Sequence, residues 1–348
     1  MQKLVRRSAA RVTIVDVAKA AGVSPATVSN AITGKKKVDE ATRSRIEDAI
    51  GELGYIPNAA ARGMRTGRSN AIAIYSSMPT GVAAGASKLG FLMEVAASAA
   101  VTAMETNTSL VLVPPISDPS QAVRSIAIDG ALLLEPLEND PVLDATLSRG
   151  IPTVTIGAPI GRECHHVDLD YALMAELLIT HLIDGGARSF PLLIGKSRRK
   201  SNIEFVKAYA RHADALGMTP RILEIDEAQA EENALAAVAN EIGTGPVPDA
   251  ILVPIDAMAT GAMGALRQAG LRVPEDVRVA TRYDGVRARS EDPQLTALDL
   301  QLEEVAKVAT QALSRLIEGE AVEPRIAAPK PTLIARASSR AQPGQCEP

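Results

Sequence analysis

Four residues between positions 26 and 33 are small or carry hydrogen-bonding groups, and they recur at helical spacing. Ala26, Ser29, Asn30 and Thr33 recur at intervals of three and four, which places them on one face of a helix. Hydroxyl and amide groups donate and accept hydrogen bonds at base edges, and the small alanine allows close approach. The pattern therefore predicts a helix that enters the major groove of DNA, with an ordinary helical hairpin as the alternative.

Two short helices joined by a tight turn are predicted in residues 12–33 and would hold this face in place. Thr13 and Asp16 have the spacing of a capping box, and Ser24 suits an N-cap before Pro25, a favoured first residue of a helix. Apolar residues recur at helical spacing on the opposite faces, namely Ile14, Val17, Ala18, Ala21, Val28, Ala31 and Ile32. We expect these residues to pack together, which makes the segment a helix-turn-helix unit.

A third helix and a short linker helix are predicted to follow. Asp39 is a candidate N-cap and Gly54 a candidate end for a helix that would complete a small bundle. Asn58 can cap a further helix over residues 58–65, but two turns that contain a glycine are too short to be stable alone. The linker helix therefore needs a partner, either DNA or its own copy from a second subunit.

The charge of the chain is unevenly distributed between a basic N-terminal part and an acidic body. Residues 1–70 hold 13 Lys and Arg against six acids, a net charge of +7, which leaves −11 for the rest of the 348 residues. A basic head suits a polyanion, while the acidic body is free to bind something else. Two cysteines, Cys164 and Cys346, are too few for a disulfide framework, and neither a secretory signal nor an apolar run of about 20 residues is present. We expect a cytoplasmic protein that does not enter a membrane.

From Ala71 onward, apolar strand-like runs alternate with helical segments. The runs occupy residues 71–75, 109–113, 131–134, 153–156, 191–194, 221–225, 250–253 and 277–280. The helical segments occupy residues 91–105, 173–183, 204–216, 232–242 and 258–269. Continuous apolar strands between helices predict parallel sheets covered on both faces, here in two doubly wound lobes with a ligand cleft between them. A late helix at 302–317 and a final strand at 332–335 are expected to cross back to the first lobe.

Longer motifs spread over residues 12–339 carry a family resemblance. The head contains VTIVDVAKAAGVSPATVSNAI and TRSRIEDAIGELGYIPNAAARGMRTGR. The body contains IDGALLLEP, GIPTVTIG, VDLDY, HLIDGGAR, DAMATGAMGALRQAGLRVPEDV, PQLTAL and LIARASS. With these motifs the chain resembles the LacI/GalR (lactose-repressor) family of bacterial transcription regulators. The resemblance implies an all-α helix-turn-helix head plus an α/β periplasmic-binding-protein-like core of two doubly wound parallel-sheet lobes.

The implied domain plan has four parts. They are a DNA-binding head at 1–56, a hinge helix and linker at 57–70, an effector-binding and dimerisation core at 71–339, and a disordered tail at 340–348. Within the core, the N-lobe is expected at about 71–167 and 297–327, and the C-lobe at about 168–296. The end of the chain is expected to cross near the cleft.

The resemblance also implies a function. The chain would be a sequence-specific repressor that binds a near-palindromic double-stranded DNA operator as a homodimer, with a sugar or sugar-derived small-molecule effector in the cleft. A cytoplasmic solute-binding protein without effector-dependent regulation is the alternative. Cys164, His165 and His166 are adjacent and rarely converge on one zinc ion, and the sequence has no nucleophile or cofactor motif. We therefore expect no catalytic residue, cofactor or metal.

Several positions of the head match family positions that contact DNA. Asn30 stands where many members have arginine, which shifts the expected base preference from guanine to adenine. Met64 stands where the family inserts a leucine wedge into the minor groove, and Arg65 beside it can neutralise phosphate. The expected DNA-binding residues are Thr13, Ile14, Ser24, Pro25, Ala26, Thr27, Ser29, Asn30, Thr33, Lys37, Asn58, Arg62, Met64 and Arg65.

The expected effector pocket departs from the family pattern. Its residues are Ser76, Ser77, Phe91, Arg198, Phe205, Ile255, Arg282, Tyr283 and Asp284. Phe205, Ile255 and Tyr283 stand where polar side chains usually bind the ligand, which removes hydrogen-bond partners that a simple sugar needs. A less polar effector, a differently posed sugar and no effector all stay open. Arg282 ends an apolar strand, where it needs an anionic partner or the water of the cleft.

Overall fold

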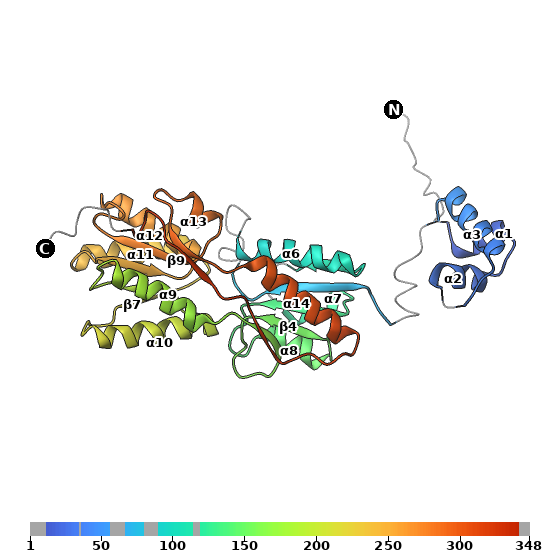
Figure 1. Cartoon of the computed structure of the whole chain (residues 1–348), viewed down its shortest axis with the longest axis horizontal. Coiled ribbons are helices and arrows are strands. Elements are labelled where there is room, and N and C mark those ends of the chain that lie inside the picture. Colours follow the sequence, from blue (N-terminus) through green and yellow to red (C-terminus); the bar gives the residue numbers. More distant parts are fainter. Residues whose placement is uncertain (1–11, 35, 56–66, 80–89, 114–118, 341–348) are drawn as a thin grey trace, which may run out of the picture. The chain divides into compact units, whose positions relative to one another are not determined.

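The computed structural model describes residues 12–34, 36–55, 67–79, 90–113 and 119–340 (Figure 1). The chain forms two compact units, Met1–Ser69 and Asn70–Pro348. The linker helix expected at 58–65 and the tail beyond residue 340 lie outside the described residues. In the described part of the chain, no helix is long and apolar enough to span a bilayer.

The first unit contains three capped helices, α1 (Ile14–Ala21), α2 (Pro25–Thr33) and α3 (Glu40–Leu53). The backbone N–H of Thr13 donates to the carboxylate of Asp16 at 2.8 Å, which closes the capping box before α1. The Ser24 hydroxyl accepts a hydrogen bond from the Thr27 N–H at 3.1 Å, and Asp39 caps α3 in the same way. All three predicted caps are confirmed, because a cap depends on residues only three positions apart.

The head core forms as the helical spacing predicts. Its buried residues are Val17, Ala18, Ala21, Val28, Ile46 and Ala49. Ile14, Val23, Ala31, Ile32 and Ile50 pack against these residues at the rim. The turn between α1 and α2 is made by Gly22 with φ +67°, a left-handed conformation that side chains disfavour. The helix-turn-helix geometry therefore follows from local sequence signals.

The second unit begins with an N-lobe built on a six-stranded parallel sheet in the order β11-β5-β4-β3-β1-β2. The strands are β1 (Ala71–Ser76), β2 (Ser109–Leu112), β3 (Gly130–Leu134), β4 (Thr153–Ile156), β5 (His165–Asp168) and β11 (Arg325–Ala327). The helices are α6 (Phe91–Glu105), α7 (Pro119–Ser125), α8 (Pro141–Ser148) and α14 (Leu302–Ile317). Alternate residues of β1 and β3 pack toward α6 and α14 on one face and toward α7 and α8 on the other.

The C-lobe contains a second six-stranded sheet in the order β12-β10-β9-β8-β6-β7. Its strands are β6 (Leu192–Gly195), β7 (Ile222–Ile225), β8 (Ala250–Val253), β9 (Arg278–Tyr283), β10 (Thr296–Asp299) and β12 (Thr332–Ile334). Its helices are α9 (Tyr171–Asp184), α10 (Lys200–Ala215), α11 (Ala230–Thr244), α12 (Asp256–Gln268) and α13 (Val286–Ser290). Helices α9 and α10 pack as one pair, and α11 and α12 as another (Figure 1).

The eight predicted strand runs all overlap observed strands, but the end of the chain differs from the prediction. Helix α14 packs on the N-lobe as expected. The final strand β12 does not return to the N-lobe, because it pairs antiparallel with β10 of the C-lobe, with Ala297 opposite Ile334. The range 297–299, expected in the N-lobe, belongs to this C-lobe strand as well. Strands β5, β10 and β11 were not predicted, since polar or charged residues interrupt these short segments (HHVD, TALD and RIA), which therefore do not form continuous apolar runs.

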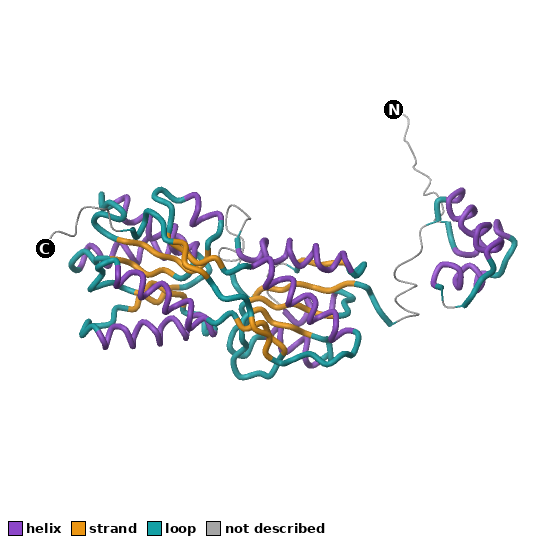
Figure 2. The backbone as a smooth tube through the Cα atoms, viewed as in Figure 1, coloured by secondary structure: helices purple, strands orange, loops and turns teal. Residues whose placement is uncertain are grey.

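Three segments cross between the lobes, and Figure 2 shows them as loops. They join β5 to α9, β10 to α14, and β11 to β12. Asp170 and Gln301 occupy matching left-handed positions with φ 49° and 50° at the first two crossings. In each case the backbone N–H donates to an aspartate two residues earlier, Asp168 or Asp299, at 3.1 and 2.8 Å. These paired turns set the direction in which the chain enters α9 and α14.

Candidate functional site

The N-terminal end of α2 is the exposed surface that sequence reasoning assigned to DNA. Ser24, Pro25 and Ala26 are exposed, while Ser29 and Asn30 are half-buried along the same helix. Helix α2 contains no charged residue and no acid in its first turn, whereas α1 and α3 each carry one. The positive end of the helix dipole is therefore not neutralised by the helix itself, which favours approach to an anion such as DNA phosphate.

The other expected DNA-binding positions are distributed around α2. Lys37 is exposed in the loop after α2, and Thr33 is the last residue of the helix. Thr13 is exposed, but its hydroxyl lies 2.7 Å from the Asp16 carboxylate, and this hydrogen bond lowers the pKa of Asp16. Ile14 packs at the rim of the head core. Asn58, Arg62, Met64 and Arg65 lie outside the described residues.

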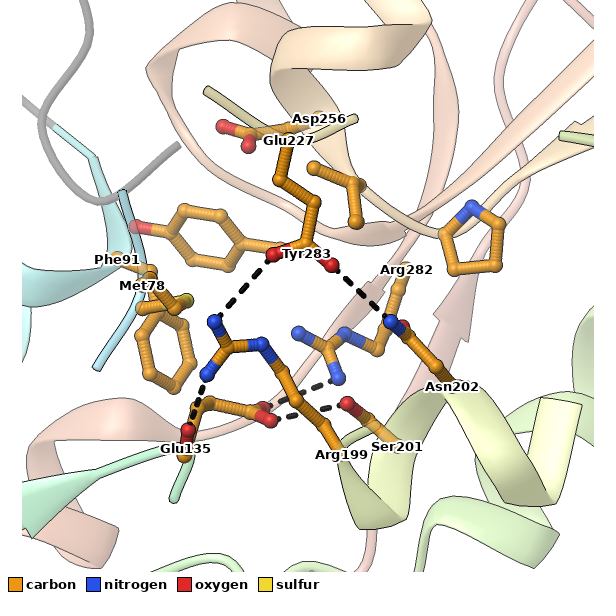
Figure 3. A pocket seen from close by; sticks show the side chains of 12 residues that line it. Met78, Phe91, Glu135, Arg199, Ser201, Asn202, Glu227, Asp256, Arg282 and Tyr283 are labelled. Carbon is orange, nitrogen blue, oxygen red and sulfur yellow. Dashed lines mark hydrogen bonds and ion pairs between the residues drawn. The ribbon is translucent and has the colours of Figure 1, made fainter. Parts of the chain in front are cut away.

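A second candidate site is the inter-lobe cleft of the second unit, drawn in Figure 3. It is lined by Met78, Phe91, Glu135, Arg199, Ser201, Asn202, Glu227, Pro254, Ile255, Asp256, Arg282 and Tyr283. Glu135, Glu227 and Pro254 each follow the carboxyl end of a strand, which is where open α/β sheets bind ligands. The free volume between the side chains is about 20 Å³, room for a single water molecule. In this arrangement the side chains of the cleft themselves fill the space.

Glu135 of the N-lobe is held almost entirely by C-lobe donors. The Ser201 hydroxyl donates to one carboxylate oxygen at 2.9 Å, and the Arg282 guanidinium lies 3.1 Å from the other. The guanidinium of Arg199 donates to the Glu135 backbone carbonyl. Glu135 is 2% exposed and has φ 49°, a left-handed conformation that is strained for a residue with a side chain. The two lobes are thus joined through one buried acid.

Arg199 also links the two lobes. Its side chain donates to the Ser77 carbonyl of the N-lobe at 2.8 Å and pairs with Glu227 of the C-lobe at 3.3 Å. Asn202 donates to the other carboxylate oxygen of Glu227 at 3.1 Å (Figure 3). Each buried charge therefore has an opposite charge or a hydrogen-bond partner nearby, as burial requires.

Aromatic residues close one side of the cleft. Phe91 of α6 meets Tyr283 of β9 edge to face, with ring centroids 5.6 Å apart. The Tyr283 hydroxyl donates to Glu94 of the N-lobe, and burial together with this acid raises the pKa of Tyr283. Asp256 also lines the cleft, and burial raises its pKa although Arg287 lies 3.3 Å away.

The structure brings four of the nine expected effector residues to the lining: Phe91, Ile255, Arg282 and Tyr283. Ser76 and Ser77 lie next to it, where the Ser77 carbonyl binds Arg199 and its hydroxyl donates to Asp140. Phe205 of α10 does not line the cleft, because its side chain is fully buried in the hydrophobic core. Asp284 is directed elsewhere, in a pair with Arg336 at 2.5 Å.

The prediction of Arg198 as a cleft residue is wrong by one position. Its side chain is exposed and pairs with Glu138 at 2.6 Å outside the lining, whereas its neighbour Arg199 enters the cleft. Sequence reasoning missed the other eight lining residues, which are Met78, Glu135, Arg199, Ser201, Asn202, Glu227, Pro254 and Asp256. Glu135 carried a usable signal, since a charged residue at the end of an apolar run is what singled out Arg282, and Glu135 directly follows such a run.

The three adjacent residues with zinc-binding side chains, Cys164, His165 and His166, make other contacts in the structure. The Cys164 thiol lies 3.4 Å from the Thr153 carbonyl, and burial raises its pKa to about 11. His166 contacts the Cys164 carbonyl at 3.0 Å, and His165 contacts the Glu323 carbonyl at 3.3 Å. Among the described residues, no group of three or more potential ligands converges on a metal position.

Comparison with known proteins finds a match for each of the two parts of the chain that carry these sites. Residues 13–58 match the model of the bacterial regulatory proteins of the lacI family, and residues 179–339 match a periplasmic binding protein-like domain. The HTH-type transcriptional regulator CelR of Thermobifida fusca is 28% identical over 337 residues, which cover 90% of this chain and 94% of that protein.

Solved structures agree with this relation over nearly the whole chain. A CelR–cellobiose complex is 27% identical, with a TM-score of 0.70, and the match covers 94% of this chain and 100% of that one. The Lac repressor dimer bound to operator and the anti-inducer ONPF shares the fold at 24% identity, with a TM-score of 0.82 and coverage of 95% and 100%. Residues 13–58 therefore form a DNA-binding domain of the lacI family of bacterial regulatory proteins, and residues 179–339 form a periplasmic binding protein-like domain.

Proposed function

We propose that the chain is a repressor that binds a near-palindromic operator as a homodimer, with an affinity set by a sugar or sugar-derived effector in the inter-lobe cleft. The observation that carries the proposal is the exposed, acid-free N-terminal end of α2 on a head of net charge +7. A regulator of this kind acts where the chromosome lies, in the bacterial cytoplasm.

Base reading is assigned to the polar residues of α2. Asn30 can pair bidentately with adenine, and Ser29 can donate to or accept from either base type. Pro25 and Ala26 offer only apolar contact, which suits a thymine methyl group. Much of the affinity would then come from phosphate contacts of the surrounding lysines and arginines, so it should fall steeply with salt.

Effector control follows from the position of the cleft. A ligand there touches both lobes, so it changes the balance between two lobe arrangements by its difference in affinity for them. The complex of the CelR relative holds cellobiose, which supports a ligand of the sugar class here.

A homodimer is supported by an apolar patch on the N-lobe. Val101 and Met104 of α6 are 63% and 72% exposed, and Leu112 of the neighbouring edge strand β2 is 41% exposed. An exposed group of large apolar side chains is costly in water and typical of a protein interface. A second copy of this chain would cover the patch and align two heads with two half-sites.

The test is selection of preferred sequences from random double-stranded DNA with the full-length protein, followed by affinity measurements at one fixed salt concentration. We expect paired half-sites, and a loss for Asn30→Ala confined to one base pair per half-site, worth about 1–3 kcal/mol. Asn240→Ala, exposed on α11, is the matched control and should bind as the wild type does. Sequence-independent binding, or an unchanged preference in Asn30→Ala, would contradict the proposal.

A further inference from the structure

Glu135 occupies the cleft as a bound carboxylate would. It comes from the N-lobe, yet its partners lie in the C-lobe: Ser201 donates to Oε2, Arg199 donates to the backbone carbonyl, and Arg282 forms an ion pair with Oε1. All three partners are at most 8% exposed. The C-lobe therefore presents a built, buried site for a carboxylate, and a residue of the opposite lobe fills it.

The pairing of buried arginines with acids inside the C-lobe also indicates a carboxylate site. Arg199 is neutralised by Glu227 and Arg287 by Asp256, both pairs lying at 3.3 Å inside the C-lobe. Among the described residues, the only acid that forms an ion pair with Arg282 is Glu135 of the N-lobe. When Glu135 withdraws, the C-lobe face keeps one cation without an ion-pair partner, which favours a ligand with one negative charge.

Glu135 does not satisfy this site completely. Arg282 Nε and Glu135 Oε1 are both buried without a hydrogen-bond partner. A guanidinium can hold a free carboxylate through two parallel hydrogen bonds, which is stronger than the single close approach made by Glu135. Since about 20 Å³ of space is left, a ligand cannot join Glu135 and has to replace it.

We infer that the C-lobe carries a carboxylate site, which Glu135 fills when the lobes are joined and which the carboxylate of a small organic acid fills when Glu135 withdraws. This inference rests on the proposed effector role of the cleft and narrows the effector to a sugar acid or a related monocarboxylate. The effector then competes with Glu135 and favours the arrangement in which the two lobes are separated at this point.

The competing explanation is a neutral sugar whose hydroxyls donate to Glu135. The two explanations predict opposite changes in ligand affinity for Glu135→Gln. A competitor that is weakened lets a carboxylate bind more tightly, whereas a ligand acceptor that is weakened lets a neutral sugar bind less tightly. A change at this single residue therefore separates them.

The experiment uses the full-length protein and three probes, namely acetate, its neutral analogue acetamide, and D-glucose. Thermal unfolding gives the affinity of each probe through the rise in Tm with concentration. Sodium chloride keeps the ionic strength constant, so that general screening does not mimic binding. Arg198→Gln, which removes the adjacent exposed arginine, is the matched control.

We expect acetate to bind Glu135→Gln about tenfold more tightly than the wild type, with no response to acetamide and no change in Arg198→Gln. Replacing Arg282 by Gln in the Glu135→Gln background should abolish the acetate response. Glu135→Asp keeps the negative charge but shortens the side chain, so it should also raise the affinity for acetate. This variant replaces Glu135→Gln in the experiment if the Gln variant does not fold.

Two outcomes overturn the inference. One is an equal or absent response of Glu135→Gln to acetate and acetamide. The other is stabilisation of the wild type by D-glucose that is lost in Glu135→Gln, since this would make Glu135 a sugar acceptor. Operator affinity without probe is measured in parallel, so that intact operator binding with a failed acetate response rejects the carboxylate site and leaves the proposed repressor function standing.

Discussion

Replacing Arg199 by methionine tests whether the buried charges of the cleft hold the core together. Arg199 is 3% exposed, and its guanidinium bonds to the Ser77 and Glu135 carbonyls and to Glu227. Methionine fills much of the same volume but leaves the Glu227 carboxylate, itself 3% exposed, without a cation. Breaking a buried pair by removing one partner typically costs about 3–5 kcal/mol.

The expected loss lies toward the lower end of that range, because Asn202 still donates to Glu227 at 3.1 Å. We therefore expect Arg199→Met to lower the free energy of unfolding by about 3 kcal/mol. Adding Glu227→Gln removes the orphaned charge, so the double variant should recover about 2 kcal/mol of this loss as coupling between neighbouring sites.

Urea unfolding followed by circular dichroism measures these free energies in the full-length protein. Arg198→Met is the control, since Arg198 is exposed in its pair with Glu138 and its loss should leave the unfolding curve unchanged. If Arg199→Met costs no more than Arg198→Met, or if Glu227→Gln adds a further loss in the double variant, the role given to this pair is refuted.

Two further predictions concern pH and assembly. Burial lowers the pKa of His181, whose ring lies 2.7 Å from the Ser339 hydroxyl. The neutral ring therefore contributes its full stability above 6.5, the pKa of an unfolded histidine, and this contribution is lost as the pH falls. The difference in unfolding free energy between the wild type and His181→Gln should therefore shrink below that pH, and a constant difference would contradict this. Met104→Glu should weaken homodimer association at least about tenfold in sedimentation equilibrium through like charges that face each other. Val247→Glu, at another exposed apolar position, should dimerise normally, and equal effects of both variants would place the interface elsewhere.

The head could be predicted from the sequence because its signals are local. The caps at Thr13, Ser24 and Asp39 act over three residues, and the apolar periodicity of α1 and α2 identifies their buried faces. The strands at 71–75 and 250–253 were equally clear, because strands buried on both faces read as continuous apolar runs.

The pairing of the last strands was not decided locally. Strand β12 has three residues, and its partner β10 lies more than 30 positions earlier in the chain. Segments this short fit the edge of either sheet by composition alone. Their place depends on which edge the preceding crossing brings them to, which is a property of the whole core.

The cleft shows the same division between local signals and tertiary structure. The sequence by itself placed a ligand site at strand carboxyl ends and singled out Arg282, because a charge at the end of an apolar strand is a local pattern. Only the tertiary structure decided that Arg199 rather than Arg198 enters the cleft, since the start of α10 at Lys200 sends adjacent side chains in different directions. It also decided that Glu135 meets Ser201 and Arg282, 66 and 147 positions away, because such contacts exist only once two separately wound sheets close against each other.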